Sequence, residues 1–193
     1  MSTTTTTTTS TTTTLTGTTT THPRVLSVSK SPTHTISKTP VPSITLLPNH
    51  GVSGDCHAGK TTQHTTSSTT ANNLRQIHLL PIESLRHISS TTSFKGTKPL
   101  TPGGIGENVT TEGIELGNLP PGTEIHFGNQ DGSENGAVVV ITSVREPGPG
   151  LDRVRPGLRE AFRGVRKGWW GVLGVVVKGG EVRGGMGVRV VVK

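Results

Sequence analysis

A short segment in the first third of the chain brings together three side chains that could do chemistry. It reads Gly51-Val-Ser-Gly-Asp-Cys-His-Ala-Gly59, and its glycines let the backbone approach a ligand closely. Asp55 and His57 lie two positions apart, so an extended chain places both on one face. They could bind a metal ion, or Asp55 could orient the His57 ring. A turn with a hydrogen-bonded histidine explains the same residues, and the pattern alone favours that simpler interpretation.

A second segment is rich in glycine and hydroxyl groups and reads Pro102-Gly-Gly-Ile-Gly-Glu-Asn-Val-Thr-Thr-Glu-Gly113. Exposed backbone N–H groups and hydroxyls of this kind can hold an anion. The segment lacks the Gly-Lys-Ser/Thr ending of a phosphate-binding P-loop and the βαβ setting of a dinucleotide fingerprint. A structural turn stabilised by Asn108 is equally compatible. The residues that could form an anion cradle are Gly103, Gly104, Asn108, Thr110 and Thr111.

A third segment, Ser143-Val-Arg-Glu-Pro-Gly-Pro-Gly-Leu-Asp152, follows an apolar run. It places Arg145 at the expected end of a strand, where a guanidinium can hold a phosphate or carboxylate through two hydrogen bonds. For an isolated arginine, a surface salt bridge to Glu146 or Asp152 is the simpler interpretation.

The elements that must position these segments are mostly short strands. Alternating or continuous apolar residues predict strands, and apolar residues at helical spacing predict two short helices. The expected strands are 24–30, 74–80, 122–127 and 137–144, the expected helices are 81–88 and 157–163, and the Pro-rich stretch 32–48 suits loops and sheet edges. Residues 171–177 and 188–192 resemble the two arms of a hairpin with Gly179 and Gly180 at its tip. We expect a mainly β fold with short helices, closed or strongly curved as a β-barrel.

Composition limits the size and the setting of this fold. Residues 1–22 are almost all Thr and Ser, so we expect a disordered tail, followed by one domain over 23–193 with a flexible insertion at about 60–73. The chain has no apolar run long enough for a membrane span. A single cysteine excludes an internal disulfide and favours a reducing, cytoplasmic location.

Charge favours negatively charged partners. The formal net charge is +7, but aromatic residues make up only 3% of the chain and the basic residues are scattered. Stacking platforms for single-stranded nucleic acid are therefore not expected. A phosphate-bearing small molecule is the better candidate.

Taken together and in this order, the segments resemble the MOSC domain, the C-terminal module of molybdenum cofactor sulfurases, which also occurs as a stand-alone protein. The Gly106-Glu-Asn-Val-Thr-Thr-Glu-Gly113 stretch is the most specific portion of the match. The other matching pieces are Gly54-Asp-Cys-His-Ala-Gly59, Arg75-Gln-Ile, Glu83, Leu119-Pro-Pro-Gly-Thr123, Arg145-Glu-Pro147, Trp170-Gly-Val and Gly180-Glu-Val-Arg183.

The resemblance implies a β-barrel-like fold and work with the molybdenum cofactor, a pterin that bears a phosphate. Family members carry sulfur or reduce N-hydroxylated compounds, so an electron or sulfur donor protein is an implied partner. Molybdenum ion binding and pyridoxal phosphate binding are further implied properties. On the matching positions, Arg145 would grip the phosphate or pterin, and Asp55 and His57 would line the pocket, with His57 as a proton donor. Arg75 would add a second positive charge.

The sequence departs from the family pattern at Gly148. There the family carries a cysteine after the Arg-x-Pro motif, thought to ligate molybdenum or to carry persulfide sulfur. Glycine supplies neither a soft ligand nor a nucleophile. Three explanations stay open: the protein binds the cofactor without catalysis, Cys56 beside His57 takes over the thiol role, or little function is left. A basic module for a phosphate-bearing ligand or nucleic acid is the alternative from another class.

Overall fold

The computed structural model describes residues 22–61, 71–94, 96–129, 136–165 and 169–193. Residues 1–21 of the expected Thr-rich tail and residues 62–70 of the expected insertion lie outside the described residues. A backbone bridge between Thr61 and Asn72 joins the two sides of that insertion.

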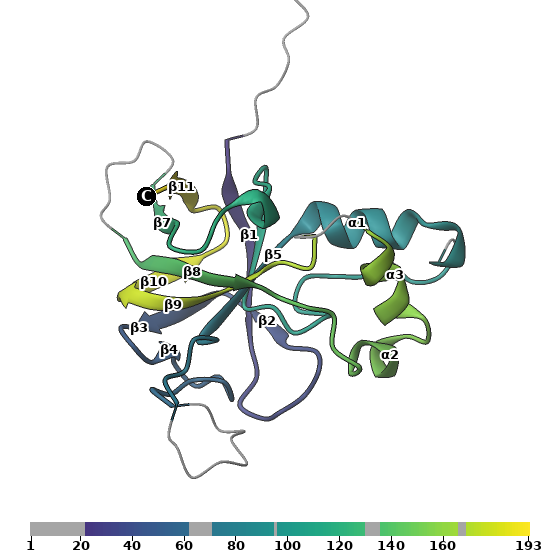
Figure 1. Ribbon diagram of the computed structural model, residues 1–193, viewed down its shortest axis with the longest axis horizontal. Helices are drawn as coiled ribbons and strands as arrows, with labels where there is room; N and C mark the ends of the chain where they lie inside the picture. Colours follow the sequence, from purple (N-terminus) through teal and green to yellow (C-terminus); the bar gives the residue numbers. More distant parts are fainter. Residues whose placement is uncertain (1–21, 62–70, 95, 130–135, 166–168) are drawn as a thin grey trace, which may run out of the picture.

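Most of the described strands form one sheet that closes on itself. Its order is β11 (Gly187–Val191), β7 (Glu124–Gly128), β8 (Val138–Val144), β9 (Val172–Lys178), β5 (Ile77–Pro81), β6 (Val109–Glu112), β1 (Arg24–Lys30) and β2 (Thr39–Val41). Pairing of Arg24 with Gly187 joins β1 to β11, which makes a seven-stranded barrel with β2 added outside it. Neighbours are antiparallel except β5 and β6, which run parallel. The predicted mainly β, barrel-like fold is confirmed (Figure 1).

A smaller sheet lies beside the barrel and consists of β10 (Gly180–Arg183), β3 (Ser43–Leu47) and β4 (Gly51–Val52). The Pro-rich stretch therefore does contribute strands, but it avoids helices as predicted. Pro40 lies in β2, the outermost strand of the large sheet, opposite Ser29 of β1. Proline has no N–H to donate, so an edge strand is where a sheet accepts it.

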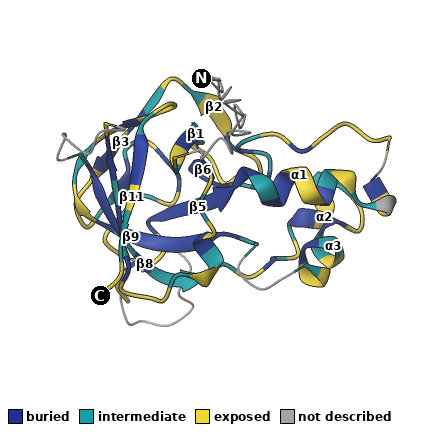
Figure 2. Ribbon diagram, turned by 90° about the horizontal axis from the view of Figure 1, so that it is seen from above, coloured by how far each residue is buried: buried dark blue, intermediate teal, exposed yellow. Residues whose placement is uncertain are grey.

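Short helices gather at one side of the barrel (Figures 1 and 2). They are α1 (Ile82–Ser90), α2 (Leu151–Val154) and α3 (Leu158–Gly164), with the short 3₁₀ turn η1 (Thr92–Phe94). A second 3₁₀ turn, η2 (Leu116–Asn118), lies against the barrel, and its Leu116 belongs to the barrel core. Both predicted helices are present, shifted by one or two residues. In α1 the buried face is formed by Ile82, Leu85 and Ile88, which recur at helical spacing and follow Pro81.

Two hydrophobic clusters hold these layers together. The larger one fills the barrel with aliphatic side chains from alternate strand positions and with Phe127. The smaller one lies between the barrel and the helices and contains Leu80, Leu85, Leu158 and Phe162, all fully buried. Figure 2 shows the buried residues, in dark blue, along the strands and in parts of the helices.

The strand predicted from residue 74 begins later, at Ile77. Leu74 is 57% exposed, and the Asn73 side chain accepts a hydrogen bond from the Arg75 backbone N–H, which holds a local turn. Side-chain capture of the backbone competes with strand pairing here.

The predicted C-terminal hairpin is wrong. Both edges of β9 are already taken, by β5 and β8, and β11 pairs with β7 and β1 instead. Gly179 and Gly180 do not form a hairpin tip but carry the chain into β10, which pairs with β3. A Cβ at Gly179 would lie 2.9 Å from the Leu46 carbonyl oxygen, so close backbone approach explains the glycine.

Within the described stretches of the chain, none of the helices combines the length and the apolar character that crossing a membrane requires.

We expect Leu79→Ala to lower the free energy of unfolding by about 2–5 kcal/mol, because Leu79 is fully buried in the barrel and its loss leaves a cavity. Urea unfolding measures this. The matched control is Leu74→Ala, at a 57% exposed position, which should change the free energy by no more than about 0.5 kcal/mol. Equal effects of the two substitutions would contradict this account of the core.

Candidate anion-binding site

A cavity of about 850 Å³ lies where β5, β8 and β9 meet the helix side of the molecule, within the size range of small-molecule sites. Its wall is strongly basic. The basic residues that line it are Lys38, Arg75, Arg145, Arg159 and Arg163, and His57 and His78 lie among them. Among the described residues, Glu146 is the one acidic residue in the wall. We call this space the basic cavity.

Arg145 is fixed in this wall by its own hydrogen bonds. One guanidinium nitrogen donates to His78 Nδ1 at 2.8 Å and to the Ile105 carbonyl oxygen at 3.2 Å. Because a guanidinium can only donate, His78 Nδ1 must accept, and Nε2 carries the proton that it donates to the Trp170 carbonyl at 3.2 Å. A neutral histidine therefore orients the arginine, and Arg145 forms no surface salt bridge to Glu146 or Asp152.

The surroundings keep His78 neutral. Burial and then the Arg145 guanidinium hold the pKa of His78 well below its usual range, since both penalise a second positive charge. Burial also lowers the pKa of Arg145, although a guanidinium stays charged at neutral pH.

Asp55 does not face the cavity but anchors several of the segments around it. Its buried carboxylate lies 2.8 Å from the Lys38 ammonium and accepts hydrogen bonds from the Asn108 amide and from the backbone N–H groups of Ser31 and His57. The His57 ring nitrogen Nδ1 lies 3.3 Å from the same carboxylate. The expectation that Asp55 orients His57 agrees with this geometry.

The two charges of this pair depend on each other. Burial alone would raise the pKa of Asp55, but hydrogen bonds from His57 and the charge and hydrogen bond of Lys38 outweigh it and hold that pKa well below its usual range. Burial lowers the pKa of Lys38, against the opposing pull of Asp55. The pair is an internal ion pair at neutral pH.

The glycine-rich segment does form an anion cradle, but the anion is the protein's own Glu107. Its fully buried carboxylate accepts hydrogen bonds from the backbone N–H groups of Gly103 at 2.7 Å and Ile105 at 3.3 Å, and from the Thr110 hydroxyl at 3.1 Å. Burial raises the pKa of Glu107 in spite of these bonds. Because internal donors are occupied, a direct role of Gly103 and Thr110 in ligand binding stays a prediction.

Asn108 connects this segment to the rest of the site. Its amide donates to the Ser29 carbonyl oxygen and to Asp55, while its side-chain oxygen accepts from the His78 backbone N–H at 3.2 Å. One side chain thus ties β1, β5 and the Asp55 segment together at the cavity wall.

The family model of the MOSC domain matches residues 62–189, about two thirds of the chain. This chain belongs to the MOSC domain family.

Solved structures agree with this assignment. The crystal structure of the YuaD protein from Bacillus subtilis is 22% identical with a TM-score of 0.73, over 88% of this chain and 96% of that one. The chain is also similar to YiiM from Geobacillus stearothermophilus, at 19% identity and a TM-score of 0.62, over 88% of this chain and 75% of that one. YiiM from Escherichia coli is 17% identical with a TM-score of 0.59, over 88% of this chain and 70% of that one. At such identities the likeness shows the fold. No curated protein sequence matches the chain.

The structure brings some of the predicted site residues together and leaves others apart. His57, Arg75, Asn108 and Arg145 line the basic cavity. Outside that lining lie Asp55, Cys56, Gly103, Gly104, Thr110 and Thr111. Thr111 is fully buried, and its hydroxyl has no hydrogen-bond partner among the described residues. The roles assigned to all these residues stay predictions.

Sequence reasoning missed four cavity residues. Arg159 and Arg163 lie one helical turn apart on α3, and that i, i+4 spacing of two cations was a signal that could have found them. Lys38 and His78 gave no such signal, because a lysine in a Pro-rich loop and a histidine in an apolar strand become significant only when the barrel closes.

Gly148 lies in the wall of the basic cavity, at the position where the family's cysteine is expected. A Cβ added at Gly148 would meet no described atom within 4 Å. Space for the missing thiol is therefore present.

The residues of the cavity fit a phosphorylated pterin in size and charge. None of the cavity's four arginines forms a salt bridge with a carboxylate of the described residues, although the charge of the buried Glu107 acts on Arg145. The fit ends at the metal, because the wall offers no thiolate at position 148.

We expect the free energy of unfolding to fall as the pH drops below about 6.5, the pKa of an unfolded histidine. The pKa of His78 is lower in the folded chain than in the unfolded chain, so on acidification the unfolded chain takes up the proton first. The contribution of His78 to the free energy of unfolding is therefore complete above about pH 6.5 and is lost as the pH falls below it. The contribution of one such histidine is at most about 1.4 kcal/mol per pH unit.

Urea unfolding at several pH values, compared with His78→Gln, isolates this effect, because glutamine offers an acceptor and a donor but does not titrate. The raised pKa of Glu107 contributes with the opposite sign in both proteins. Parallel stability curves for the two proteins would show that His78 is not held neutral.

Proposed function

We propose that this MOSC protein binds the molybdenum cofactor, with the phosphate and the pterin in the basic cavity. The observation that carries the proposal is the gathering of Arg75, Arg145, Arg159 and Arg163 around one space, with none of them in a salt bridge to a carboxylate of the described residues. Like charges held close repel each other, and a multiply charged anion removes that cost.

The arginines differ in how they would hold this ligand. Arg145 is half-buried and already oriented by His78, so it would grip an anionic group with little loss of side-chain freedom. Arg75 and Arg163 are exposed and would close over the ligand. The exposed ring of His57, one of whose nitrogens faces Asp55, would hold or supply a proton at the cavity wall.

The bound cofactor supplies redox chemistry at its molybdenum, which in this family serves the reduction of N-hydroxylated compounds. Sulfur transfer depends on a thiol, and here position 148 carries none. We therefore propose a cofactor-binding protein and assign it no thiol-dependent reaction. An electron or sulfur donor protein and a cytoplasmic location stay predictions.

The alternative thiol is Cys56. It is buried, lies outside the lining of the basic cavity, and has its sulfur 3.1 Å from His57 Nδ1. Burial and the Asp55 carboxylate raise the pKa of this thiol, which disfavours the nucleophilic thiolate. These observations speak against Cys56 as a replacement for the family's cysteine.

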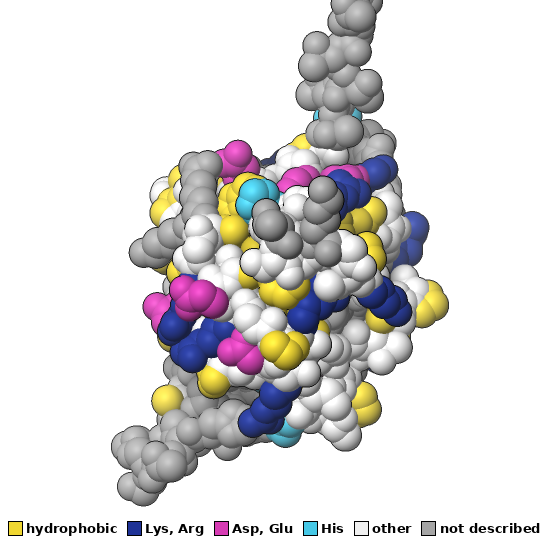
Figure 3. All heavy atoms as spheres, turned by 90° about the vertical axis from the view of Figure 1, so that its right-hand side faces the viewer, with side chains coloured by type: hydrophobic (Ala, Val, Ile, Leu, Met, Phe, Trp, Pro, Cys, Tyr) yellow, Lys and Arg dark blue, Asp and Glu magenta, His cyan; other side chains and the backbone are white. Residues whose placement is uncertain are grey.

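Two other ligands have less support. Enzymes that use pyridoxal phosphate attach it to a lysine amine, and Lys38, the lysine in the cavity wall, is ion-paired with Asp55. For nucleic acid, one would expect a continuous basic surface. On the face that carries the helices, the visible Lys and Arg side chains form several separate groups with acidic side chains beside some of them (Figure 3).

We expect Arg145→Ala to weaken cofactor binding about 10- to 100-fold, the loss of a charged hydrogen-bonding group worth about 1.5–3 kcal/mol. Arg153→Ala makes the same change of charge at an exposed position of α2 outside the cavity and should bind normally. Arg145→Lys keeps the charge but loses the two-pronged donor, so it should be intermediate.

Binding is measured by fluorescence titration with isolated molybdopterin, after circular dichroism confirms that each variant folds. Wild-type affinity in the Arg145→Ala variant would remove the proposed role of Arg145 and the main support for the cavity as the binding site.

We expect Gly148→Cys to retain more molybdenum per protein than the wild type after loading with the cofactor and desalting. A Cβ added at Gly148 meets no described atom within 4 Å beyond its chain neighbours, so the backbone leaves room for a side chain, and a thiolate is a soft ligand. Gly164→Cys adds the same thiol outside the cavity, also in open space, and serves as the control. Equal molybdenum content in all three proteins would place the metal away from position 148.

A further inference from the structure

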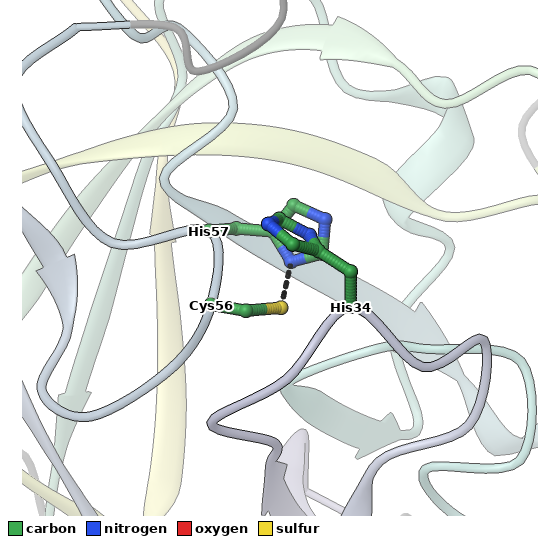
Figure 4. A group of neighbouring side chains, drawn as sticks. All are labelled: His34, Cys56 and His57. Atoms are coloured by element: carbon green, nitrogen blue, oxygen red, sulfur yellow. Dashed lines mark hydrogen bonds between the residues drawn. The ribbon is translucent and has the colours of Figure 1, made fainter.

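Three side chains with metal-binding atoms come together beside the basic cavity. They are His34, Cys56 and His57, which we call the His–Cys–His cluster (Figure 4). The sulfur and one ring nitrogen of each histidine all lie within 4.8 Å of one another. His57 also lines the cavity, so the cluster stands at its edge.

The chemistry of these donors matches zinc. Zn²⁺ prefers imidazole nitrogens and a cysteine sulfur whose proton leaves when the ion binds, and three protein ligands leave a fourth position for water or another molecule. With bond lengths of about 2.0–2.3 Å, tetrahedral ligands lie about 3.3–3.6 Å apart. The Cys56 sulfur is 3.1 Å from His57 Nδ1, so small side-chain rotations are enough to make room for the ion.

The rings are arranged in a way that suits a shared ion. His34 and His57 stand almost perpendicular, at 89°, with their centres 5.4 Å apart. Both histidines are exposed, whereas the cysteine is buried. An ion can therefore enter from the solvent side and meet a sulfur that is shielded from it.

The backbone holds the two halves of the cluster together before any ion binds. The Cys56 N–H donates to the Ser31 carbonyl at 2.8 Å, and the Ser31 N–H donates to the Asp55 carboxylate at 3.1 Å. The Ser31 hydroxyl then bonds to the Thr33 carbonyl and Thr35 hydroxyl on either side of His34. Such support keeps donor atoms in place and lowers the cost of binding.

Asp55 holds the backbone of His57 in place. Its Oδ1 accepts the His57 backbone N–H at 3.0 Å. The same Oδ1 lies 3.3 Å from His57 Nδ1, the nitrogen that faces Cys56, so this side-chain contact is given up when Nδ1 binds the ion. The nearby Lys38 ammonium is neutralised by the same Asp55, so it presents no unpaired positive charge to the ion.

We propose that His34, Cys56 and His57 form a binding site for Zn²⁺ at the edge of the basic cavity. The site goes beyond the proposed cofactor binding and does not depend on it. It gives Cys56 a role as a ligand, and it leaves one coordination position of the ion for water or for a ligand of the cavity.

Co²⁺, which replaces Zn²⁺ and is coloured, tests this directly on the full chain without a histidine tag and without cofactor. We expect one equivalent to produce a sulfur-to-cobalt charge-transfer band together with visible bands typical of four-coordinate Co²⁺, and Zn²⁺ to abolish both. Because Cys56 is the chain's single cysteine, the charge-transfer band reports on this site alone.

The variants are chosen to separate ligation from folding. Cys56→Ser should lose the charge-transfer band, while His34→Asn and His57→Asn, at exposed positions, should each weaken Co²⁺ binding at least tenfold with an unchanged fold. His87→Asn changes an exposed histidine of α1 outside the cluster and should bind like the wild type.

Absence of a sulfur-to-cobalt band in the wild type at one equivalent would overturn the proposal. So would wild-type affinity in both histidine variants. Retained molybdopterin binding in the same preparations would show that such a failure concerns the metal site and not the basic cavity.

Discussion

The buried Asp55 carboxylate is the interaction on which the rest of the site depends. It joins segments that are far apart in the sequence, through Ser31, Lys38, Asn108 and His57. A buried ion pair gains little net stability over an apolar pair, but removing one partner costs about 3–5 kcal/mol because the other charge is left uncompensated. The pair therefore acts mainly by specifying one arrangement of the cavity wall, because Asp55 fixes the positions of Lys38, His57 and Asn108 through its hydrogen bonds.

A second carboxylate, Glu107, has the same structural role in the neighbouring glycine-rich segment. It occupies the backbone N–H groups of that segment and keeps the loop folded beneath Arg145, while Asn108 links it to Asp55 and His78. Within this motif Gly106 and Asn108 line the cavity, whereas Glu107 is fully buried behind them. Because Glu107 already occupies the backbone N–H groups of the glycine-rich segment, an external anion would bind to the arginines of the cavity, including the half-buried Arg145.

Sequence reasoning succeeded where the signal was local. Alternation, apolar runs and helical spacing predicted β1, β7, β8, α1 and α3 and a barrel-like fold. Three cavity residues, His57, Asn108 and Arg145, came from the local segments, and the resemblance added Arg75. Sequence reasoning failed where the pairing of strands depends on segments that are far away in the sequence. The apolar runs of β9 and β11 resemble the two arms of a hairpin, but β9 pairs with β5 and β8, and β11 pairs with β7 and β1. These pairings result from closure of the barrel, and the residues of the two runs do not indicate them. For the same reason Lys38 and His34, in a loop with no regular pattern, could not be assigned to the site beforehand.

The geometry places the positive charge and the thiol of this chain at different sites. Positive charge gathers around Arg145, which is fixed by a neutral histidine, whereas the single thiol stands beyond the cavity lining, against His57. Gly148 leaves open space in the cavity wall and supplies no side chain that could bind a ligand. An anion in this space would gain most from the arginines, since none of them forms a salt bridge with a carboxylate of the described residues, and its binding would stabilise the folded chain by linkage. Recognition of the anion can therefore persist without the sulfur chemistry, because the two rest on different residues.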